Sequence, residues 1–249
     1  MAFAFFLIVL SIAFLYFGAD LSLSASEVIG RKLGLSPLAI GMLIVGFGTS
    51  LPELFVGHIA GIKGNHEVAV GSLIGSNIAN MFLILGISSF LTPLLLKGKG
   101  IREQVGVHLL LSFVLAFIFL VYGRIDLISS CLLLGLIAVY LFFVYRDLNR
   151  EHEDTSTEPE SEGRGGVIVI KLIIGFSLLY LGGELLVKGG VELAQNFGIS
   201  AYAISAIFLA FGTSFPELVT SLIASLKGKD SDLIIGNILG SNIFNYAFI

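Results

Sequence analysis

The stretch Gly48–Leu54 reads GTSLPEL, and the later stretch Gly212–Leu218 reads GTSFPEL. Two other segments recur at the same spacing: YFGAD at 16–20 is matched by YLGGE at 180–184, and GLS at 34–36 by GIS at 198–200. A fourth segment, GSNIAN at 75–80, is matched by GSNIFN at 240–245, as if the second copy had gained a single residue in the preceding loop. Four collinear matches indicate that the chain consists of two related units.

The composition is that of a protein dissolved in a lipid bilayer. Of the 249 residues, 56% are hydrophobic and 13% are charged, and the mean hydropathy is +0.98. Charged residues fall in short clusters between apolar stretches that are long enough to cross the hydrocarbon core. Hydropathy predicts about eight spans, near 3–29, 37–62, 67–93, 104–122, 125–145, 166–191, 200–226 and 232–249. We therefore predict an all-α polytopic membrane protein.

One long polar segment divides the chain. Residues 146–165 are rich in Glu, Ser and Thr and predict a solvated acidic linker. It separates a first repeat of five helices, residues 1–145, from the first three helices of a second repeat, residues 166–249. Because five is an odd number of crossings, the second repeat starts on the opposite side of the membrane, and the two repeats have inverted topology.

The distribution of Lys and Arg predicts the orientation. Of the 14 such residues, all but Lys63, Arg124 and Lys188 fall on one side of the predicted membrane. Cytoplasmic loops carry the excess of positive charge. We expect a multi-pass protein of the cell membrane with its N-terminus outside and the 146–165 linker in the cytoplasm. By repeat symmetry, we also expect two further C-terminal helices, missing after Ile249, to complete the second repeat.

Two carboxylates lie in the middle of predicted spans, Glu53 and Glu217. An ionised carboxylate costs roughly 2.5 to 3.5 kcal/mol at membrane depth even on insertion scales. A neutral structural Glu and an ordinary proline kink are the alternatives, and duplication at matched positions disfavours both. Thr49 and Ser50 precede Glu53 by four and three residues, so the trio is expected to share a helix face; Thr213 and Ser214 repeat this arrangement before Glu217.

Prolines next to these carboxylates predict broken helices. Pro52 and Pro216 lack an amide hydrogen and loosen the preceding turn. Backbone carbonyls freed at membrane depth are tolerated where they face a polar cavity, and helices broken at corresponding positions of two inverted repeats point to a transporter's binding site. We therefore place a mid-membrane site at the two breaks.

The second duplicated motif supplies further oxygens. Ser76 with Asn80, and Ser241 with Asn245, are spaced i, i+4 and line one helix face each. Gly71 with Gly75, and Gly236 with Gly240, have the small-xxx-small spacing that lets helices approach closely. For Asn77 and Asn242, about a quarter turn away, we favour interhelical hydrogen bonding over ligation.

Every candidate ligand is an oxygen atom, which indicates a hard cation. Zinc or copper would require clustered His or Cys; the histidines are scattered and Cys131 has no partner. Two carboxylates balance one Ca²⁺ or two monovalent ions, so ions of either kind would compete for one pocket, and competition at one site is the basis of exchange. For the duplicated Asp20 and Glu184, assistance to ion access and an interfacial role are equally open.

These motifs resemble the alpha repeats of the cation/Ca²⁺ exchanger superfamily, GTSxPE followed by GSNxxN, and the Thr-Ser pair resembles its sodium/calcium exchanger branch. The resemblance implies ten helices and electrogenic Na⁺-for-Ca²⁺ exchange. Asn245 stands where K⁺-dependent members typically have Asp, which argues against K⁺ co-transport. The resemblance implies that Glu53 and Glu217 bind Ca²⁺ at the centre, assisted by Thr49 and Thr213. It also implies two flanking Na⁺ sites, one formed by Ser50, Ser76 and the Gly46 carbonyl, and the other by Ser214, Ser241 and the Ala210 carbonyl. Asn80 and Asn245 would complete the site.

We therefore expect a secondary antiporter that works by alternating access. A related carrier coupled to H⁺ or K⁺, or one for another divalent metal, is the alternative. An enzyme would need one asymmetric acid–base or nucleophile constellation, and a scaffold would not need two buried carboxylates. The expected partners are Na⁺, Ca²⁺ and the lipid bilayer; we expect no cofactor, no nucleic acid and a monomer.

Overall fold

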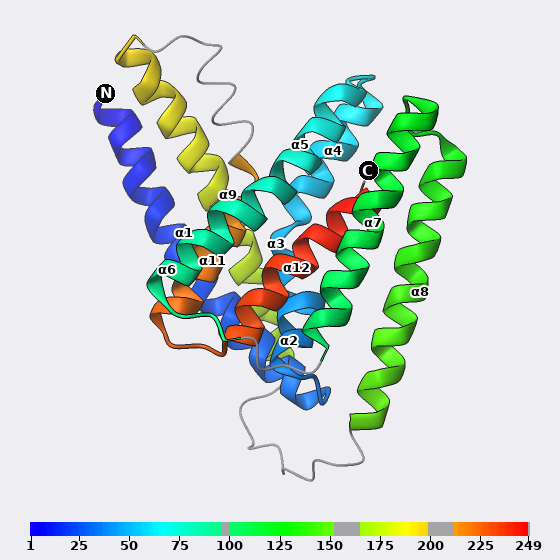
Figure 1. The fold of residues 1–249 in the computed structure, drawn as a ribbon. Helices are drawn as coiled ribbons and strands as arrows, with labels where there is room; N and C mark the ends of the chain where they lie inside the picture. Colours follow the sequence, from blue (N-terminus) through cyan, green and yellow to red (C-terminus); the bar gives the residue numbers. More distant parts are fainter. Residues whose placement is uncertain (96–99, 152–164, 199–211, 249) are drawn as a thin grey trace.

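The computed structural model describes residues 1–95, 100–151, 165–198 and 212–248 (Figure 1). Within these ranges all regular secondary structure is helical. Four helical spans are long and apolar enough to cross a membrane, and a helix pair bent by 43° qualifies as a fifth, broken span. The prediction of an all-α polytopic membrane protein is confirmed.

Within the described residues the helices follow the predicted spans, and residues 200–211 of the span predicted at 200–226 lie outside them. The helices are α1 (Ala2–Lys32), α2 (Pro37–Ile40), η1 (Gly41–Gly46), α3 (Phe47–Thr49), α4 (Leu51–Ile62), α5 (His66–Ile78), η2 (Ala79–Ile84), α6 (Leu85–Leu91), α7 (Ile101–Tyr122), α8 (Leu127–Glu151), α9 (Gly165–Asn196), α11 (Phe215–Leu226) and α12 (Ser231–Phe248). The helix α8 continues through Glu151, into the first residues of the predicted linker, and residues 152–164 of that linker lie outside the described residues. Extending a formed helix by a turn is easy, since each added residue gains one hydrogen bond.

The helices α1 and α9 are repeat counterparts, and they pack against each other in opposite directions (Figure 1). A Cβ added to Gly182 would lie 3.0 Å from the backbone nitrogen of Leu15, and one added to Gly175 would lie 2.6 Å from that of Ser22. Residues later in α1 therefore contact residues earlier in α9. Counterpart helices that run antiparallel are what inverted repeats require.

The helix α12 packs closely on the broken segment of the first repeat. A Cβ at Gly236 would lie 2.3 Å from the Leu38 carbonyl oxygen, and a Cβ at Gly240 would lie 2.5 Å from that of Met42. The predicted close approach at these two glycines is confirmed. For Gly71 and Gly75, no described atom lies within 4 Å of an added Cβ.

The remaining surface of α12 is covered as well. Its residues Leu239, Ile243 and Tyr246 belong to one apolar cluster with Leu111 of α7 and Leu133 of α8. The buried residues of α12 therefore face other helices on several sides. This burial holds its polar side chains in defined directions.

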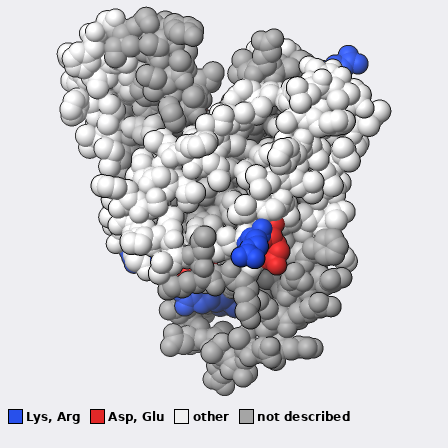
Figure 2. Space-filling view, in the orientation of Figure 1, with Lys and Arg blue, Asp and Glu red and all other residues white. Residues whose placement is uncertain are grey.

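The connections collect at two ends of the molecule. The α4–α5 and α7–α8 connections lie at the end that carries the N-terminus, whereas the α11–α12 connection and the end of α8 lie at the other (Figure 1). Figure 2 shows charged side chains near these ends and a broad band of uncharged side chains between them. This band is suited to contact the hydrocarbon core.

We predict that Gly240→Ala destabilises the protein by about 1–3 kcal/mol, because the methyl group has to displace the Met42 backbone. The apparent melting temperature in detergent should fall. Gly135→Ala is the control, since no described atom lies within 4 Å of its added Cβ. Equal melting temperatures for both variants would contradict the packing described here.

Candidate cation site

The two carboxylates lie at matched places in the two repeats, each three residues after the serine that precedes its helix. α3 ends at Thr49, Ser50 has φ −83° and ψ 2°, and α4 begins at the next residue. Ser214 has nearly the same geometry, φ −87° and ψ 3°, before α11. Glu53 and Glu217 therefore lie in the first turn of their helices, where the helix dipole stabilises negative charge. Both side chains are fully buried.

Glu53 is surrounded by hydroxyls from both repeats. Ser76 Oγ donates to Glu53 Oε1 at 2.8 Å, and Ser214 Oγ lies 3.5 Å from the same oxygen. The two hydroxyl oxygens are 2.6 Å apart. This side of the site thus combines one carboxylate with a serine pair.

Glu217 has the matching arrangement. Ser50 Oγ donates to Glu217 Oε1 at 3.1 Å, and Ser241 Oγ lies 3.5 Å from that oxygen. Ser241 Oγ also lies 3.2 Å from the Gly46 carbonyl oxygen and 3.4 Å from Thr49 Oγ1. Carboxylate, hydroxyl and carbonyl oxygens therefore converge here.

The predicted grouping of these serines was wrong. We expected Ser50 with Ser76 and Ser214 with Ser241, but each broken helix sends its serine to the carboxylate of the other repeat. That grouping followed from the resemblance, whereas the structure brings Ser50 and Ser241 to Glu217 and brings Ser214 and Ser76 to Glu53. The helix break at Ser50 also means that the i, i+3 spacing does not place Ser50 beside Glu53, as we had expected from the spacing alone. Ala210 lies outside the described residues, and Thr213 Oγ1 is buried without a hydrogen bond in the part of the chain that is described.

Four asparagines form a crossed clamp between α5/η2 and α12. Asn77 Nδ2 lies 3.4 Å from the Asn242 carbonyl oxygen, and Asn242 Nδ2 lies 3.4 Å from the Asn77 carbonyl oxygen. A carbonyl can only accept, so these contacts orient both amides. Asn77 Oδ1 then accepts from Asn245 Nδ2 at 2.9 Å, and Asn242 Oδ1 accepts from Asn80 Nδ2 at 2.9 Å. The hydrogen bonding predicted for Asn77 and Asn242 is confirmed.

The clamp determines which amide atoms remain free. With their NH₂ groups engaged, Asn80 and Asn245 keep buried Oδ1 atoms that have no hydrogen-bond partner among the described residues, and so do Glu53 Oε2 and Glu217 Oε2. Buried acceptors without donors are costly. All four are carboxylate or amide oxygens, the kind of ligand that a hard cation prefers. Within the described ranges no group of three or more His, Cys, Asp or Glu side chains converges.

One polar residue at the site was missed in the sequence. Asn237 is buried on α12, and its Oδ1 lies 3.3 Å from Thr49 Oγ1. Its position one turn before Ser241 on an apolar helix was the available signal. Comparing the two repeats of the chain did not single out Asn237, because its counterpart in the first repeat is a different residue, Ser72.

Asp20 lies away from the carboxylates and pairs with Lys227 at the end of α11. The hydrogen bond that Lys227 donates to Asp20 raises the pKa of Lys227. This ion pair joins α1 to the end of α11. Glu184, the counterpart of Asp20, is exposed and has no ion pair within the described chain.

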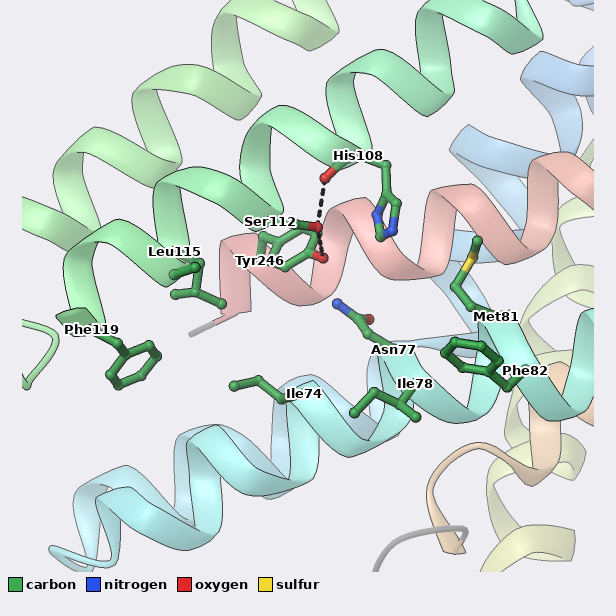
Figure 3. Close-up of a pocket in the computed structure, with 11 residues that line it drawn as sticks. Ile74, Asn77, Ile78, Met81, Phe82, His108, Ser112, Leu115, Phe119 and Tyr246 are labelled. Carbon is green, nitrogen blue, oxygen red and sulfur yellow. Dashed lines mark hydrogen bonds between the residues drawn. The ribbon is translucent and has the colours of Figure 1, made fainter.

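A cavity of about 350 Å³ adjoins the clamp between α5/η2, α7 and α12 (Figure 3). Most of its lining is apolar, with Asn77, His108, Ser112 and Tyr246 as polar members. Ser112 Oγ donates to the His108 carbonyl at 2.8 Å and lies 2.6 Å from the Tyr246 hydroxyl. Asn77 therefore belongs to the clamp and also lines this cavity.

A membrane fold of two related repeats with antiparallel counterpart helices, a broken span and two buried carboxylates surrounded by hydroxyls is typical of polytopic ion transporters. The family model described as "Sodium/calcium exchanger protein" matches residues 3–146 and 167–249. The chain belongs to this sodium/calcium exchanger family, which confirms the resemblance seen in the sequence.

Individual relatives agree with this assignment. The chain is 35% identical to the putative antiporter CaxA of Alkalimonas amylolytica, over 96% of this chain and 76% of that protein. It is 27% identical to the sodium/calcium exchanger MaX1 of Methanosarcina acetivorans, over 98% of this chain and 81% of that protein. A solved structure of the sodium-calcium exchanger NCX_Mj superposes with a TM-score of 0.80 at 30% identity, covering 99% of this chain and 81% of that one.

We predict that Asn77→Ala weakens Ca²⁺ binding about tenfold, the usual effect of losing a residue that orients a ligand. The substitution removes the acceptor that holds the Asn245 amide. Titration of the purified protein with Ca²⁺ measures the change. Asn196→Ala is the control, because Asn196 is an exposed asparagine at the end of α9. An unchanged affinity in Asn77→Ala would show that the clamp does not orient a ligand.

Proposed function

We propose that the protein is a secondary active antiporter that exchanges Na⁺ for Ca²⁺ by alternating access at the site between the broken helices. The family assignment supports cation/Ca²⁺ antiport by a multi-pass membrane protein. The observation that carries the finer proposal is the pair of fully buried carboxylates, each with one oxygen held by hydroxyls and one without a partner in the described chain.

In this proposal Ca²⁺ occupies the centre. Glu53 and Glu217 neutralise its two charges, and the free oxygens of Asn80 and Asn245 approach from the clamp. Ca²⁺ takes about 6–8 oxygen ligands in flexible geometry. Thr49 and Thr213, with their carbonyls, are proposed to supply the remaining ones.

Na⁺ would bind on the two flanks. One flank offers Glu53 with Ser76 and Ser214, and the other offers Glu217 with Ser50, Ser241 and the Gly46 carbonyl. By repeat symmetry, the Ala210 carbonyl would serve the Glu53 flank in the way that Gly46 serves the other.

Each carboxylate can balance one monovalent ion or contribute half of the charge needed by Ca²⁺. Occupation by one ion type therefore disfavours the other, and release of one requires replacement by the other. We expect no K⁺ requirement, because Asn245 is an amide tied to Asn77 rather than an additional carboxylate.

Inverted repeats give the site two nearly equivalent routes to solvent. The contacts made by Ser50 with Glu217 and by Ser214 with Glu53 exchange under the repeat relation, so opening toward one side mirrors opening toward the other. This pseudo-symmetry is the support for alternating access.

The central test is Na⁺-gradient-driven ⁴⁵Ca²⁺ uptake into proteoliposomes. We expect Glu53→Gln and Glu217→Gln each to lower uptake by about 100-fold or more, because one negative charge cannot balance Ca²⁺ at a buried site. Glu103→Gln, at an exposed carboxylate of α7, should transport normally. Equal uptake driven by a proton gradient without Na⁺ would favour an H⁺-coupled carrier; no Ca²⁺ uptake under either gradient would indicate another substrate.

We further propose that the N-terminus lies outside the cell membrane and that the 146–165 segment is cytoplasmic. In a Cys131→Ser background, Lys63→Cys should react with an impermeant thiol reagent added to intact cells, whereas Asp230→Cys should react only after permeabilisation. These positions lie in connections at opposite ends of the molecule (Figure 1). The reverse labelling pattern would invert the proposed topology.

A further inference from the structure

Asn237 links three parts of the site. It is 2% exposed on α12. Its Oδ1 accepts from Thr49 Oγ1 at 3.3 Å, and its Nδ2 donates to Ser221 Oγ of α11 at 3.1 Å. Ser221 lies one turn after Glu217 on the same helix. One carboxamide therefore connects the break of the first repeat to the helix that carries the carboxylate of the second.

The contact determines how the Thr49 hydroxyl is presented. A hydroxyl has one hydrogen and two lone pairs. Two acceptors lie within reach of this hydrogen, Asn237 Oδ1 at 3.3 Å and the Gly46 carbonyl oxygen at 3.4 Å. When the hydrogen is directed to Asn237 Oδ1, the nearer of the two, a lone pair of Thr49 Oγ1 is left toward Ser241 Oγ, 3.4 Å away. Ser241 in turn contacts Glu217 and the Gly46 carbonyl. The oxygen is thus oriented toward the Glu217 flank before an ion arrives.

Among the described residues, the corresponding positions of the other repeat do not form these hydrogen bonds. In the repeat alignment, Ser72 is the counterpart of Asn237, and Gly57 is the counterpart of Ser221. Ser72 Oγ and Thr213 Oγ1 are both buried and have no hydrogen-bond partner among the described residues. Of the two duplicated threonines, Thr49 is thus the one whose hydroxyl is held by a neighbouring amide in the described chain.

We propose that Asn237 is a positioning residue that preorganises the Thr49 hydroxyl and makes the Glu217 flank the tighter of the two Na⁺ sites. This inference rests on the proposed Na⁺-for-Ca²⁺ exchange. Preorganised oxygens bind an ion more tightly because less ordering is required on binding. The two flanks then fill in sequence rather than as equals.

The effect is expected to be larger for Na⁺ than for Ca²⁺. Asn237 makes no hydrogen bond to the side chains of Glu53, Asn80, Asn245 or Glu217 within the described structure, so these proposed Ca²⁺ ligands keep their positions. Of the Ca²⁺ ligands proposed above, only Thr49 is oriented by Asn237, and Ca²⁺ takes about 6–8 oxygen ligands in flexible geometry. A residue that merely supported the packing of α12 would alter both ions together. The comparison of the two ions is therefore the decisive readout.

The test compares Asn237→Leu with wild type in proteoliposomes. The Na⁺ concentration for half-maximal ⁴⁵Ca²⁺ exchange should rise about fivefold, the factor expected for one buried hydrogen bond. The Ca²⁺ concentration for half-maximal Ca²⁺/Ca²⁺ self-exchange without Na⁺ should change less than about twofold. Asn237→Asp, which keeps the acceptor for Thr49, should restore most of the Na⁺ affinity. Ser221→Ala should give a smaller shift in the same direction, and it offers a milder change if Asn237→Leu folds poorly.

Ser72→Ala is the matched control at the counterpart position, and its Na⁺ dependence should equal that of wild type. An unchanged Na⁺ requirement in both Asn237→Leu and Ser221→Ala would overturn the proposal, as would equal losses of Na⁺ and Ca²⁺ affinity. Loss of Na⁺ dependence in the wild type itself would instead refute the proposed exchange, so the two failures are distinguishable.

Discussion

The burial of two carboxylates at the centre of a membrane protein is the constraint on which the rest of this structure depends. Neither Glu53 nor Glu217 has an arginine or lysine among its hydrogen-bond partners in the described chain; each is stabilised by serine hydroxyls and by the start of a helix. Neutral donors and a helix dipole stabilise a carboxylate without cancelling its charge. The negative potential therefore remains available to a cation, whereas a salt bridge would have neutralised it.

The inverted repeat solves the problem of supplying enough oxygen atoms to both carboxylates. A single helix cannot surround its own carboxylate, because side chains three or four residues away cover only one face. The serine before α4 reaches the carboxylate of α11, the serine before α11 reaches the carboxylate of α4, and α5 and α12 provide the second serine at each. The asparagine clamp uses the same exchange: Asn77 orients Asn245, and Asn242 orients Asn80. Neither repeat contains a complete site.

Close backbone approach brings these groups within hydrogen-bonding range. Gly236 and Gly240 let α12 contact the segment from Leu38 to Met42, which places Ser241 beside the Gly46 carbonyl. Two π-helical segments, η1 and η2, lie just before the first break and at Asn80. Such segments rotate the following side chains relative to a regular α-helix and often occur at functional sites. The two flanks are nearly symmetric, but the hydrogen bonds of Asn237 to Thr49 and Ser221 occur at only one of them in the described chain.

The sequence by itself determined the membrane class, the positions of the spans, the internal repeat and the residue types at the site. These properties are local or periodic, and duplication made the polar positions conspicuous against an apolar background. Which serine contacts which carboxylate was decided only by the tertiary structure, because the helix breaks removed the i, i+3 relation from which we had grouped Ser50 with its own Glu53. The free Oδ1 atoms of Asn80 and Asn245 likewise depend on contacts between the two repeats, which no local pattern specifies. Asn237 escaped notice because it has no duplicate, and only the packing of α12 against the break revealed its contact with Thr49.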